Sequence, residues 1–466
     1  MRQINSCARL TSKKARTSKP PVGLDQEIEL RFDDLLSNGQ AVGRAEGMAI
    51  FVFGPLPNER ATIRITAVKQ NYAVGTVVRM LDRSDARAEP FCPVFGSCGG
   101  CQVQHLSYDQ QLIWKQALVS NALQRIGGIA TPDVKPTIGM PNPRAYRNKM
   151  ALVVDRSNNG FGFYKQRSHD IVPIGHCPIV QPSLDRCIAS LLDLRSDPQT
   201  TGAFADARHV VARTSRATGQ NVVTITGSRP SETRRKLAST LFDRLPNTAG
   251  FSESFDLSSE NAILGRKKRI LAGSESIEEI VGGIRVKISA GSFFQINIEI
   301  LERIFDAIRP LAAQAHRIFD LYCGSGAFAL CFAKAGCHVL GIEENATAVD
   351  EARRNAALNE LGARPEFRCG RVDEVLREPA TAKALRAVDA VFLDPPRKGS
   401  DPRTLSAIAE AGVASVWYLS CDPATLARDL KFLLPKGYRL NSVQPFDMFP
   451  QTGHVESLAL LSRIEK

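Results

Sequence analysis

Four side chains that can act as acids, bases or nucleophiles stand at or just past the ends of short apolar segments in the second half of the chain. They are Asp320, Glu343, Asp394 and Cys421. Short apolar segments that alternate with helical patterns predict the strands of a mostly parallel sheet. Because open α/β sheets bind ligands beyond the carboxyl ends of their strands, we expect a functional site where these groups meet.

The segment 320–329, with the sequence DLYCGSGAFA, predicts a ligand-binding turn between a strand and a helix. Its two glycines permit a tight turn and a close approach of the backbone to a ligand. Glu343, about 20 positions further on, suits hydrogen bonds to ribose hydroxyls. By itself this glycine pattern also fits a dinucleotide site. Asp320 and the sequence DPPR from Asp394 favour S-adenosylmethionine, because an acidic residue before Pro-Pro is typical of class I methyltransferases, which hold the reacting nucleotide there.

Cys421, in the sequence YLSCDP, bears on the methyl acceptor. Methylation of exocyclic amines uses a Tyr after the Pro-Pro pair, and here that position is Arg397. Carbon 5 of uracil is a poor nucleophile, but addition of a thiolate to carbon 6 makes carbon 5 electron-rich and replaces one difficult step by two easier ones. A base must then remove the proton from carbon 5. We predict that Glu456 is this base, with His454 as the alternative.

Five motifs resemble the RNA uridine-5-methyltransferase family, the RumA/TrmA group, and the likeness extends from about residue 20 to the end of the chain. The motifs are FFQIN at 293–297, DLYCGSGAF at 320–328, DPPRKG at 394–399, SCDPATLARDL at 420–430 and PQTGHVESLALL at 450–461. The resemblance implies that Cys421 is the nucleophile and that Glu456 accepts the proton.

The same resemblance implies how the cofactor and the base are held. Gln295, Tyr322 and Glu343 stand where family members bind S-adenosylmethionine. Asp394 is expected to form hydrogen bonds within the uracil pocket or at the cofactor edge. One of the adjacent phenylalanines at 293–294 is a candidate for stacking on a base, although such pairs more often lie in a core.

Four cysteines outside the catalytic motifs predict a metal site. Cys92, Cys98 and Cys101 are closely spaced, and Cys177 lies far downstream. Four thiolates fit either tetrahedral zinc or a [4Fe–4S] cluster. The five-residue gap and the resemblance to the larger family members together favour the iron–sulfur cluster, with a structural role that joins distant segments. The remaining cysteines of the second half are read as small buried hydrophobes: Cys323, Cys331, Cys337 and Cys369.

Period-2 and period-3.6 apolar patterns predict the elements that position these residues. A small barrel is expected first, from four or five short antiparallel strands that include 28–32, 49–53, 60–68 and 72–80. Next come a helix at 108–126 and an α+β region with strands at 151–154, 160–164, 221–225 and 285–289. The basic sequence GRKKR at 265–269 is read as a solvated turn. A helix at 298–313 precedes strands at 318–321, 338–342, 390–393, 416–419 and 458–460.

The predicted fold class is therefore α/β, a Rossmann-like class I methyltransferase domain with an amino-terminal TRAM- or OB-like barrel and a central α+β domain. The predicted boundaries are 1–20 for a basic tail, 21–85 for the barrel, 86–290 for the central domain with the cysteine site, and 291–466 for the catalytic domain. The barrel resembles the TRAM module of larger family members, which is taken to hold RNA.

The composition supports an RNA partner and argues against other classes. The net charge of +12, from 60 basic and 48 acidic residues, favours a polyanionic partner. By resemblance, Arg147, Lys149, Lys165 and Arg167 are candidate phosphate contacts. No apolar run approaches the roughly 20 residues of a membrane helix. Eleven cysteines without a secretory segment argue against a disulfide framework, so a cytoplasmic location is expected.

Three readings of the activity follow. The leading one is methylation of carbon 5 of uridine in 23S ribosomal RNA, because a TRAM-like barrel and a cysteine cluster accompany that substrate in the family. A transfer RNA substrate is the first alternative. An RNA cytosine-5 methyltransferase is the second, but no Pro-Cys pair stands where such an enzyme needs it. We expect no membrane partner and no obligate protein partner.

Overall fold

The computed structural model describes residues 20–259 and 262–464, so the predicted basic tail lies almost entirely outside the described residues. The chain divides into two compact units, Met1–Arg87 and Ala88–Lys466. The finer boundaries predicted at residues 85 and 290 stay predictions.

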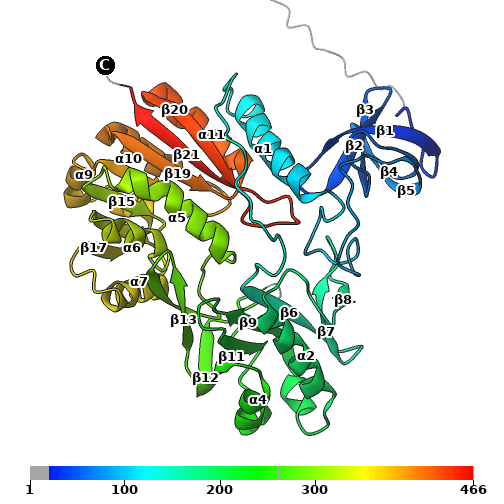
Figure 1. The fold of residues 1–466 in the computed structure, drawn as a ribbon, viewed down its shortest axis with the longest axis horizontal. Coiled ribbons are helices and arrows are strands. Elements are labelled where there is room, and N and C mark those ends of the chain that lie inside the picture. The colour runs from blue at the N-terminus through cyan, green and yellow to red at the C-terminus, as the bar shows by residue number, and fades with distance from the viewer. Residues whose placement is uncertain (1–19, 260–261, 465–466) are drawn as a thin grey trace, which may run out of the picture. The chain divides into compact units, whose positions relative to one another are not determined.

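The first unit contains a closed five-stranded barrel with the order β1-β2-β3-β5-β4 (Figure 1). Its strands are β1 (Glu27–Leu35), β2 (Gln40–Ala45), β3 (Met48–Phe53), β4 (Arg60–Val68) and β5 (Tyr72–Asp82). Alternating side chains point inward, and Phe32, Ile50 and Ile63 are fully buried. The predicted barrel is confirmed, but β3 and β5 pair in parallel, so the expectation of antiparallel strands throughout was wrong. Closure of the barrel joins these two strands, which the local pattern cannot indicate.

The second unit begins with a long helix and a seven-stranded sheet. The helix is α1 (Tyr108–Arg125), and the sheet has the order β12-β11-β10-β9-β6-β7-β8. Its strands are β6 (Lys149–Asp155), β7 (Gly160–Tyr164), β8 (Ile171–Pro173), β9 (Ala207–Thr214), β10 (Asn221–Gly227), β11 (Thr248–Phe255) and β12 (Lys267–Gly273). Its helices are α2 (Pro182–Ser196), α3 (Glu232–Lys236), α4 (Ala238–Arg244) and the 3-10 turn η1 (Thr201–Phe204). Leu152, Phe161 and Phe251 lie in the core that this sheet shares with α2.

A second seven-stranded sheet has the order β17-β16-β15-β18-β19-β21-β20, with β21 antiparallel to its neighbours. Its strands are β15 (Arg317–Leu321), β16 (His338–Glu343), β17 (Pro365–Cys369), β18 (Ala390–Leu393), β19 (Ser415–Ser420), β20 (Tyr438–Phe446) and β21 (Glu456–Arg463). Every residue of β18 is buried, as expected for a parallel strand covered on both faces. The predicted Rossmann-like architecture is confirmed.

Helices cover both faces of this sheet (Figure 1). One face packs on α5 (Ile298–Ala312), α6 (Ala327–Lys334), α7 (Ala346–Leu358) and the hairpin of β13 (Ser276–Val281) and β14 (Ile284–Ser289). The other face packs on α8 (Val372–Val375), α9 (Pro379–Leu385), α10 (Pro402–Ala411), α11 (Pro423–Leu433) and α1, with η2 (Leu434–Lys436) after α11. The helix α1 precedes this sheet by two hundred residues and nevertheless packs against α11.

Two local predictions need correction. The sequence GRKKR is only partly a turn, because Lys267 begins the edge strand β12 and Arg269 donates from Nε to Glu253 Oε1 at 2.8 Å. Cationic side chains suit an edge strand because they oppose pairing with other chains. Cys369 is exposed rather than buried, since it ends the edge strand β17. Cys323, Cys331 and Cys337 are buried, as predicted.

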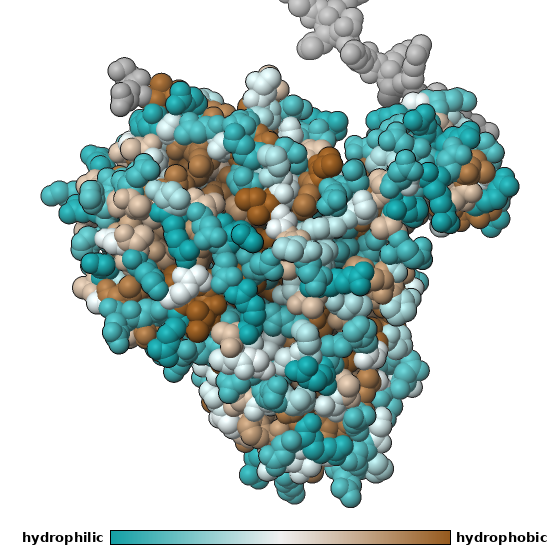
Figure 2. Space-filling model, viewed as in Figure 1, coloured by the Kyte–Doolittle hydropathy of each residue, from teal (hydrophilic) through white to brown (hydrophobic). Residues whose placement is uncertain are grey.

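The face of the molecule shown in Figure 2 is largely hydrophilic, and its apolar side chains form small separate patches. Among the described residues, no helix is both long enough and apolar enough to cross a membrane.

Candidate active site

The predicted catalytic residues meet at the carboxyl edge of the second sheet. The backbone N–H of Asp394, just past β18, donates to Leu321 O at the end of β15 at 3.3 Å. On the other side of β18, Ser420 at the end of β19 faces Ser457 of the antiparallel strand β21. Cys421 follows Ser420 and Glu456 precedes Ser457, and the two side chains interact electrostatically. The strand order therefore brings Asp394, Cys421 and Glu456 to neighbouring positions.

The glycine turn lies at the same edge, between β15 and α6. Gly324 has a φ of 54°, and a side chain built there would meet no atom within 4 Å, so its outer face is open. Gly326 has a φ of 86°, and a Cβ there would crowd Ala352 Cβ at 3.0 Å. Glu343, at the end of β16, accepts from the N–H of Gly324 at 3.1 Å and from the N–H of Asn345 at 2.8 Å. These bonds hold Glu343 beside the turn, where the sequence predicts the ribose contact.

Tyr322 belongs to this turn, whereas Gln295 comes from the segment that leads into α5. Tyr322 follows β15 with a φ of 67°, and its hydroxyl lies 3.1 Å from the hydroxyl of Ser400. Gln295 is 9% exposed and precedes α5. The carbonyl oxygen of Gln295 accepts from Asn148 Nδ2 at 3.2 Å, and the neighbouring Phe294 is buried in the apolar core. The adjacent Phe293 is 77% exposed.

The pKa values of two carboxyl groups near the turn, the buried Asp320 and the half-buried Asp394, depart from their usual range. Asp320 is fully buried, and neither of its carboxylate oxygens accepts a hydrogen bond of normal geometry from the described residues. Burial, together with the neighbouring charges of Asp394 and Glu343, raises the pKa of Asp320 well above its usual range. Burial also raises the pKa of Asp394 to about 7. A ligand with positive charge would stabilise both groups as carboxylates. S-adenosylmethionine, which carries a sulfonium and an ammonium group, fits this donor set.

The thiol and its partner carboxyl group are both held in their neutral forms by burial. Burial, Glu456 and Asp394 raise the pKa of Cys421 to about 12, and the nearby Arg397 opposes this shift. Burial and Asp394 raise the pKa of Glu456 to about 8, again with Arg397 opposing. Glu456 is 3% exposed, and its Oε2 has no hydrogen-bond partner among the described residues. A carboxyl group with such a pKa is a stronger base, once ionised, than an ordinary carboxylate.

His454, the alternative base, lies on the same loop as Glu456. Burial and the nearby cations Arg397 and Lys115 lower its pKa to about 4. The imidazole is therefore neutral at pH 7 and a weak proton acceptor. Between the two candidates, the electrostatics favour Glu456.

One polar network at this edge was not predicted from the sequence. The hydroxyl of Tyr418 on β19 donates to Asp429 Oδ2 on α11 at 2.6 Å, and both groups are buried. The N–H of Ser400 donates to the same Asp429 oxygen at 2.9 Å. The network fixes the loop after Asp394 against the strand that carries Cys421. The sequence signal for this network is Asp429, an acidic residue on the apolar face of α11.

The predicted ligand Cys177 lies near the other three cysteines of the set, although it is far from them in sequence. Burial raises the pKa of Cys101 to about 12 and that of Cys177 to about 11, and the other thiols of the set add to both shifts. Cys98 and Cys92 interact in the same way. Within residues 20–259 and 262–464, no three His, Cys, Asp or Glu side chains converge closely enough to hold a metal ion. The thiols are thus neighbours that do not meet at one point.

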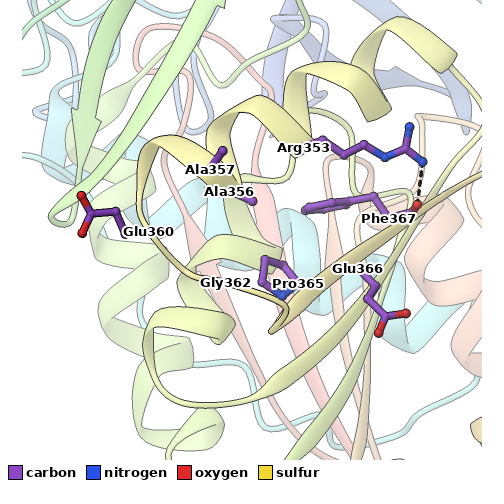
Figure 3. Close-up of a pocket in the computed structure, with 8 residues that line it drawn as sticks. All are labelled: Arg353, Ala356, Ala357, Glu360, Gly362, Pro365, Glu366 and Phe367. Carbon is purple, nitrogen blue, oxygen red and sulfur yellow. Dashed lines mark hydrogen bonds between the residues drawn. The ribbon is translucent and has the colours of Figure 1, made fainter.

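A cavity with a volume of 730 Å³ lies elsewhere, between α7 and β17 (Figure 3). Its wall includes Ala356, Ala357 and Pro365, and Arg353 donates to Phe367 O at 2.9 Å beside it. This wall uses the amino-terminal half of β17, whereas the predicted site residues stand at the carboxyl ends of the strands. None of the predicted catalytic or cofactor residues lines this cavity.

Known proteins resemble this chain over nearly its whole length. Residues 258–464 match the tRNA (Uracil-5-)-methyltransferase family, and residues 24–78 match the TRAM domain. An uncharacterized RNA methyltransferase of Halalkalibacterium halodurans is 38% identical over 451 residues, which cover 95% of this chain and 98% of the relative. A second uncharacterized RNA methyltransferase, from Bacillus cereus, is 36% identical over 460 residues, which cover 96% of this chain and 99% of the relative.

Among solved structures, the tRNA (uracil-54, C5)-methyltransferase of Pyrococcus abyssi in complex with S-adenosyl-L-homocysteine has a similar fold. The TM-score is 0.72 at 25% sequence identity, and the likeness covers 93% of this chain and all of that one. The likeness therefore includes both the barrel and the two large sheets.

Proposed function

Because this chain belongs to the RNA uracil-5-methyltransferase family, we propose that it methylates carbon 5 of a uridine through a temporary bond between Cys421 and the pyrimidine ring. Its activity is that of an S-adenosylmethionine-dependent RNA (uracil-5-)-methyltransferase. The mechanism is supported by the pairing of Ser420 with Ser457, because Cys421 and Glu456 adjoin this pair and interact electrostatically, with Asp394 also acting on Cys421.

In this mechanism the Cys421 thiolate adds to carbon 6 and forms an enolate, so that carbon 5 becomes nucleophilic. S-adenosylmethionine, when bound by Gln295, Tyr322 and Glu343, supplies the methyl group that carbon 5 takes. Glu456 then removes the proton from carbon 5. The electrons of that C–H bond restore the double bond, and Cys421 leaves as a thiolate.

Asp394 and Arg397 complete the site. Asp394 interacts electrostatically with both Cys421 and Glu456, and this supports a role in binding the polar edge of the uracil. Arg397 is exposed and stabilises the anionic forms of both groups. Its charge also suits the negative charge that develops on the ring oxygen as the thiolate adds.

The RNA side of the site combines an exposed ring with several cations. Phe293 is the exposed member of the phenylalanine pair, and we propose that it stacks on an RNA base. Arg147 and Lys149 lie on one backbone segment, and Lys149 is close enough to Arg147 and to Arg213 that, with burial, its pKa falls to about 7. A phosphate would relieve this crowding of positive charge. Lys165 and Arg167 are exposed and suit further phosphate contacts.

We propose 23S ribosomal RNA as the substrate, on the resemblance of the barrel and the cysteine set to the larger family members. Transfer RNA is the second candidate, supported by the likeness to the Pyrococcus abyssi enzyme, which acts on uracil 54 of tRNA. Both substrates place the enzyme in the cytoplasm.

Mapping of 5-methyluridine in ribosomal and transfer RNA, from cells with and without this protein, tests the choice. The purified enzyme is then assayed on each unmodified RNA with radiolabelled S-adenosylmethionine. Loss of one 5-methyluridine in 23S ribosomal RNA supports the first candidate, and loss in transfer RNA supports the second. Loss of 5-methylcytidine instead would contradict the proposed reaction.

We further propose that Cys92, Cys98, Cys101 and Cys177 hold a [4Fe–4S] cluster. Zinc would draw four sulfur atoms to within about 4 Å of one another, because each Zn–S bond is about 2.3 Å long. A [4Fe–4S] cluster binds each thiolate to a different iron and so holds the sulfur atoms further apart. The five-residue gap between Cys92 and Cys98 and the resemblance to the larger family members favour the cluster. When bound, the cluster would stabilise the thiolates that burial disfavours.

Anaerobic reconstitution should therefore yield about four iron and about four sulfide per chain. Replacement of Cys101 by serine should lower both to near zero, because this thiol interacts with all three of the others. Metal and sulfide analysis with the visible absorption spectrum measures this directly, and Cys187→Ser, in the core of the first large sheet, serves as the control. About one zinc per chain and no sulfide would contradict the cluster.

The activity should rise with pH while the stability of the fold falls. Below about pH 8, Glu456 and Cys421 are mainly protonated, so kcat/KM should increase from about pH 6 to about pH 9.

The raised pKa values of Asp394 and Glu456 mean that the folded state holds protons which the unfolded state has released. The free energy of unfolding should therefore decline as pH rises from about 4.5 to about 8. Pre-steady-state rates and thermal unfolding across this range measure both trends, and a stability that rises over this window would contradict the pKa assignments.

A further inference from the structure

The segment between β20 and β21 carries polar residues that are buried without belonging to a helix or strand. We call residues 447–452 the catalytic loop, since it leads directly to Glu456. Asp447, Gln451 and Thr452 are 0%, 3% and 4% exposed. Buried polar groups need partners, so other elements must hold this loop in place.

The helix α1 provides two of these partners from one face. Lys115 is fully buried and forms an ion pair with Asp447, and its Nζ also donates to Phe449 O at 3.0 Å. One turn earlier, Gln111 is 1% exposed, and both the nitrogen and the oxygen of its side-chain amide form hydrogen bonds with Gln451. Gln111 Nε2 donates to Gln451 Oε1 at 3.0 Å, and Gln111 Oε1 accepts from the N–H of Gln451 at 3.0 Å.

The contacts continue to the loop that carries the cysteine set. The N–H groups of Gln102 and Val103 donate to Gln451 O at 3.0 and 3.1 Å. Gln111 Nε2 also donates to the carbonyl oxygens of Val103 at 3.1 Å and Leu106 at 2.8 Å. Gln111 therefore joins the cysteine loop and the catalytic loop through a single side chain.

The conformation of the catalytic loop depends on these contacts. Gln451 has a φ of 71°, in the left-handed region that residues other than glycine seldom adopt. Such a conformation persists where the surrounding structure imposes it. Buried ion pairs such as Lys115–Asp447 add little net stability, whereas they fix geometry well. The arrangement thus specifies the position of the loop rather than adding to the strength of the core.

We propose that Gln111 and Lys115 are positioning residues that hold the catalytic loop so that Glu456 reaches the proton on carbon 5. The proposal rests on the function proposed above. Cys421 is carried by a different junction, between β19 and α11. Loss of the α1 contacts should therefore impair proton removal and spare the earlier addition of the thiolate.

The test is Gln111→Met, with Gln110→Leu as the matched control, because Gln110 is exposed on the next position of the same helix. Gln111→Met should lower kcat by roughly 100-fold with little change in KM, as a small misplacement of a catalytic group does. During turnover it should also accumulate a covalent enzyme–RNA species on a denaturing gel. Gln110→Leu should do neither.

A double variant, Lys115→Met with Asp447→Asn, removes the buried charges together so that none is left unpaired. It should accumulate the same covalent species. Wild-type turnover in both variants, or a parallel loss of turnover and of the covalent species, would overturn the positioning role. If Glu456→Gln forms no covalent species either, the proposed function fails. If Glu456→Gln forms it and the α1 variants do not, only the positioning role fails.

Discussion

Replacement of Cys421 by alanine should abolish methyl transfer to RNA while leaving the binding of S-adenosylmethionine and RNA intact. Without the sulfur, no thiolate adds to carbon 6, and carbon 5 of uracil keeps the low nucleophilicity of a conjugated ring. We expect kcat to fall by at least about 10⁴-fold, the scale seen when a covalent nucleophile is removed. Binding should survive because the glycine turn, Glu343 and the basic residues are on other elements.

Methyl transfer from radiolabelled S-adenosylmethionine measures the loss, and fluorescence or calorimetric titration measures both binding steps. Cys369→Ala is a matched control, because this thiol also ends a strand of the same sheet, at its far edge. It should retain nearly full activity. Substantial turnover by Cys421→Ala would contradict the covalent mechanism.

The high pKa of Cys421 affects how its thiolate forms before it adds to the pyrimidine ring. At about 12, it leaves little thiolate in the free protein at pH 7. Burial is the main cause, and the charges of Glu456 and Asp394 add to it. Hydrogen bonding of Asp394 to uracil and the positive charge of S-adenosylmethionine both act in the opposite direction. We therefore expect the thiol to be activated mainly in the ternary complex, which would protect it from oxidation and from reaction with other electrophiles when RNA is absent.

The positions of the proposed catalytic residues at the ends of strands could be predicted from the sequence, because each of them adjoins an apolar strand. Cys421 and Asp394 directly follow apolar strands, and Glu456 begins one. The parallel arrangement of β15, β18 and β19 then brings their ends together without further information. The strands β2, β17 and β20 were not predicted from the sequence, because their alternation of apolar and polar residues is weak.

Contacts between distant segments could not be predicted from the sequence. Gln111 and Gln451 are 340 positions apart, and neither carries a pattern that points to the other. The same holds for α1, whose residues Val119 and Leu123 predict an apolar face but not that this face packs on α11. Periodicity identifies which side of an element is buried, whereas the partner of that side is decided by the whole chain.

Replacement of Glu456 by glutamine should divide the reaction into its two halves. Glutamine keeps the size of the side chain and can still form hydrogen bonds, but it does not accept a proton at neutral pH. Addition of Cys421 and methylation of carbon 5 should proceed, and the product should stay joined to the enzyme through the C6–S bond. The variant should therefore yield about one methylated RNA per chain, in a species that resists a denaturing gel, with steady-state turnover reduced by at least about 10³-fold.

Two controls separate this outcome from simple inactivation. The double variant Glu456→Gln with Cys421→Ala should show no covalent species, because the sulfur atom is the point of attachment. His454→Gln, on the same loop, should turn over without trapping, since the imidazole has a pKa of about 4 and is the weaker base. Trapping by His454→Gln and not by Glu456→Gln would exchange the roles of the two residues. Because Glu456 is buried among acidic groups, the glutamine variant should also unfold at a higher temperature above about pH 8, where wild-type Glu456 is forced to carry its charge.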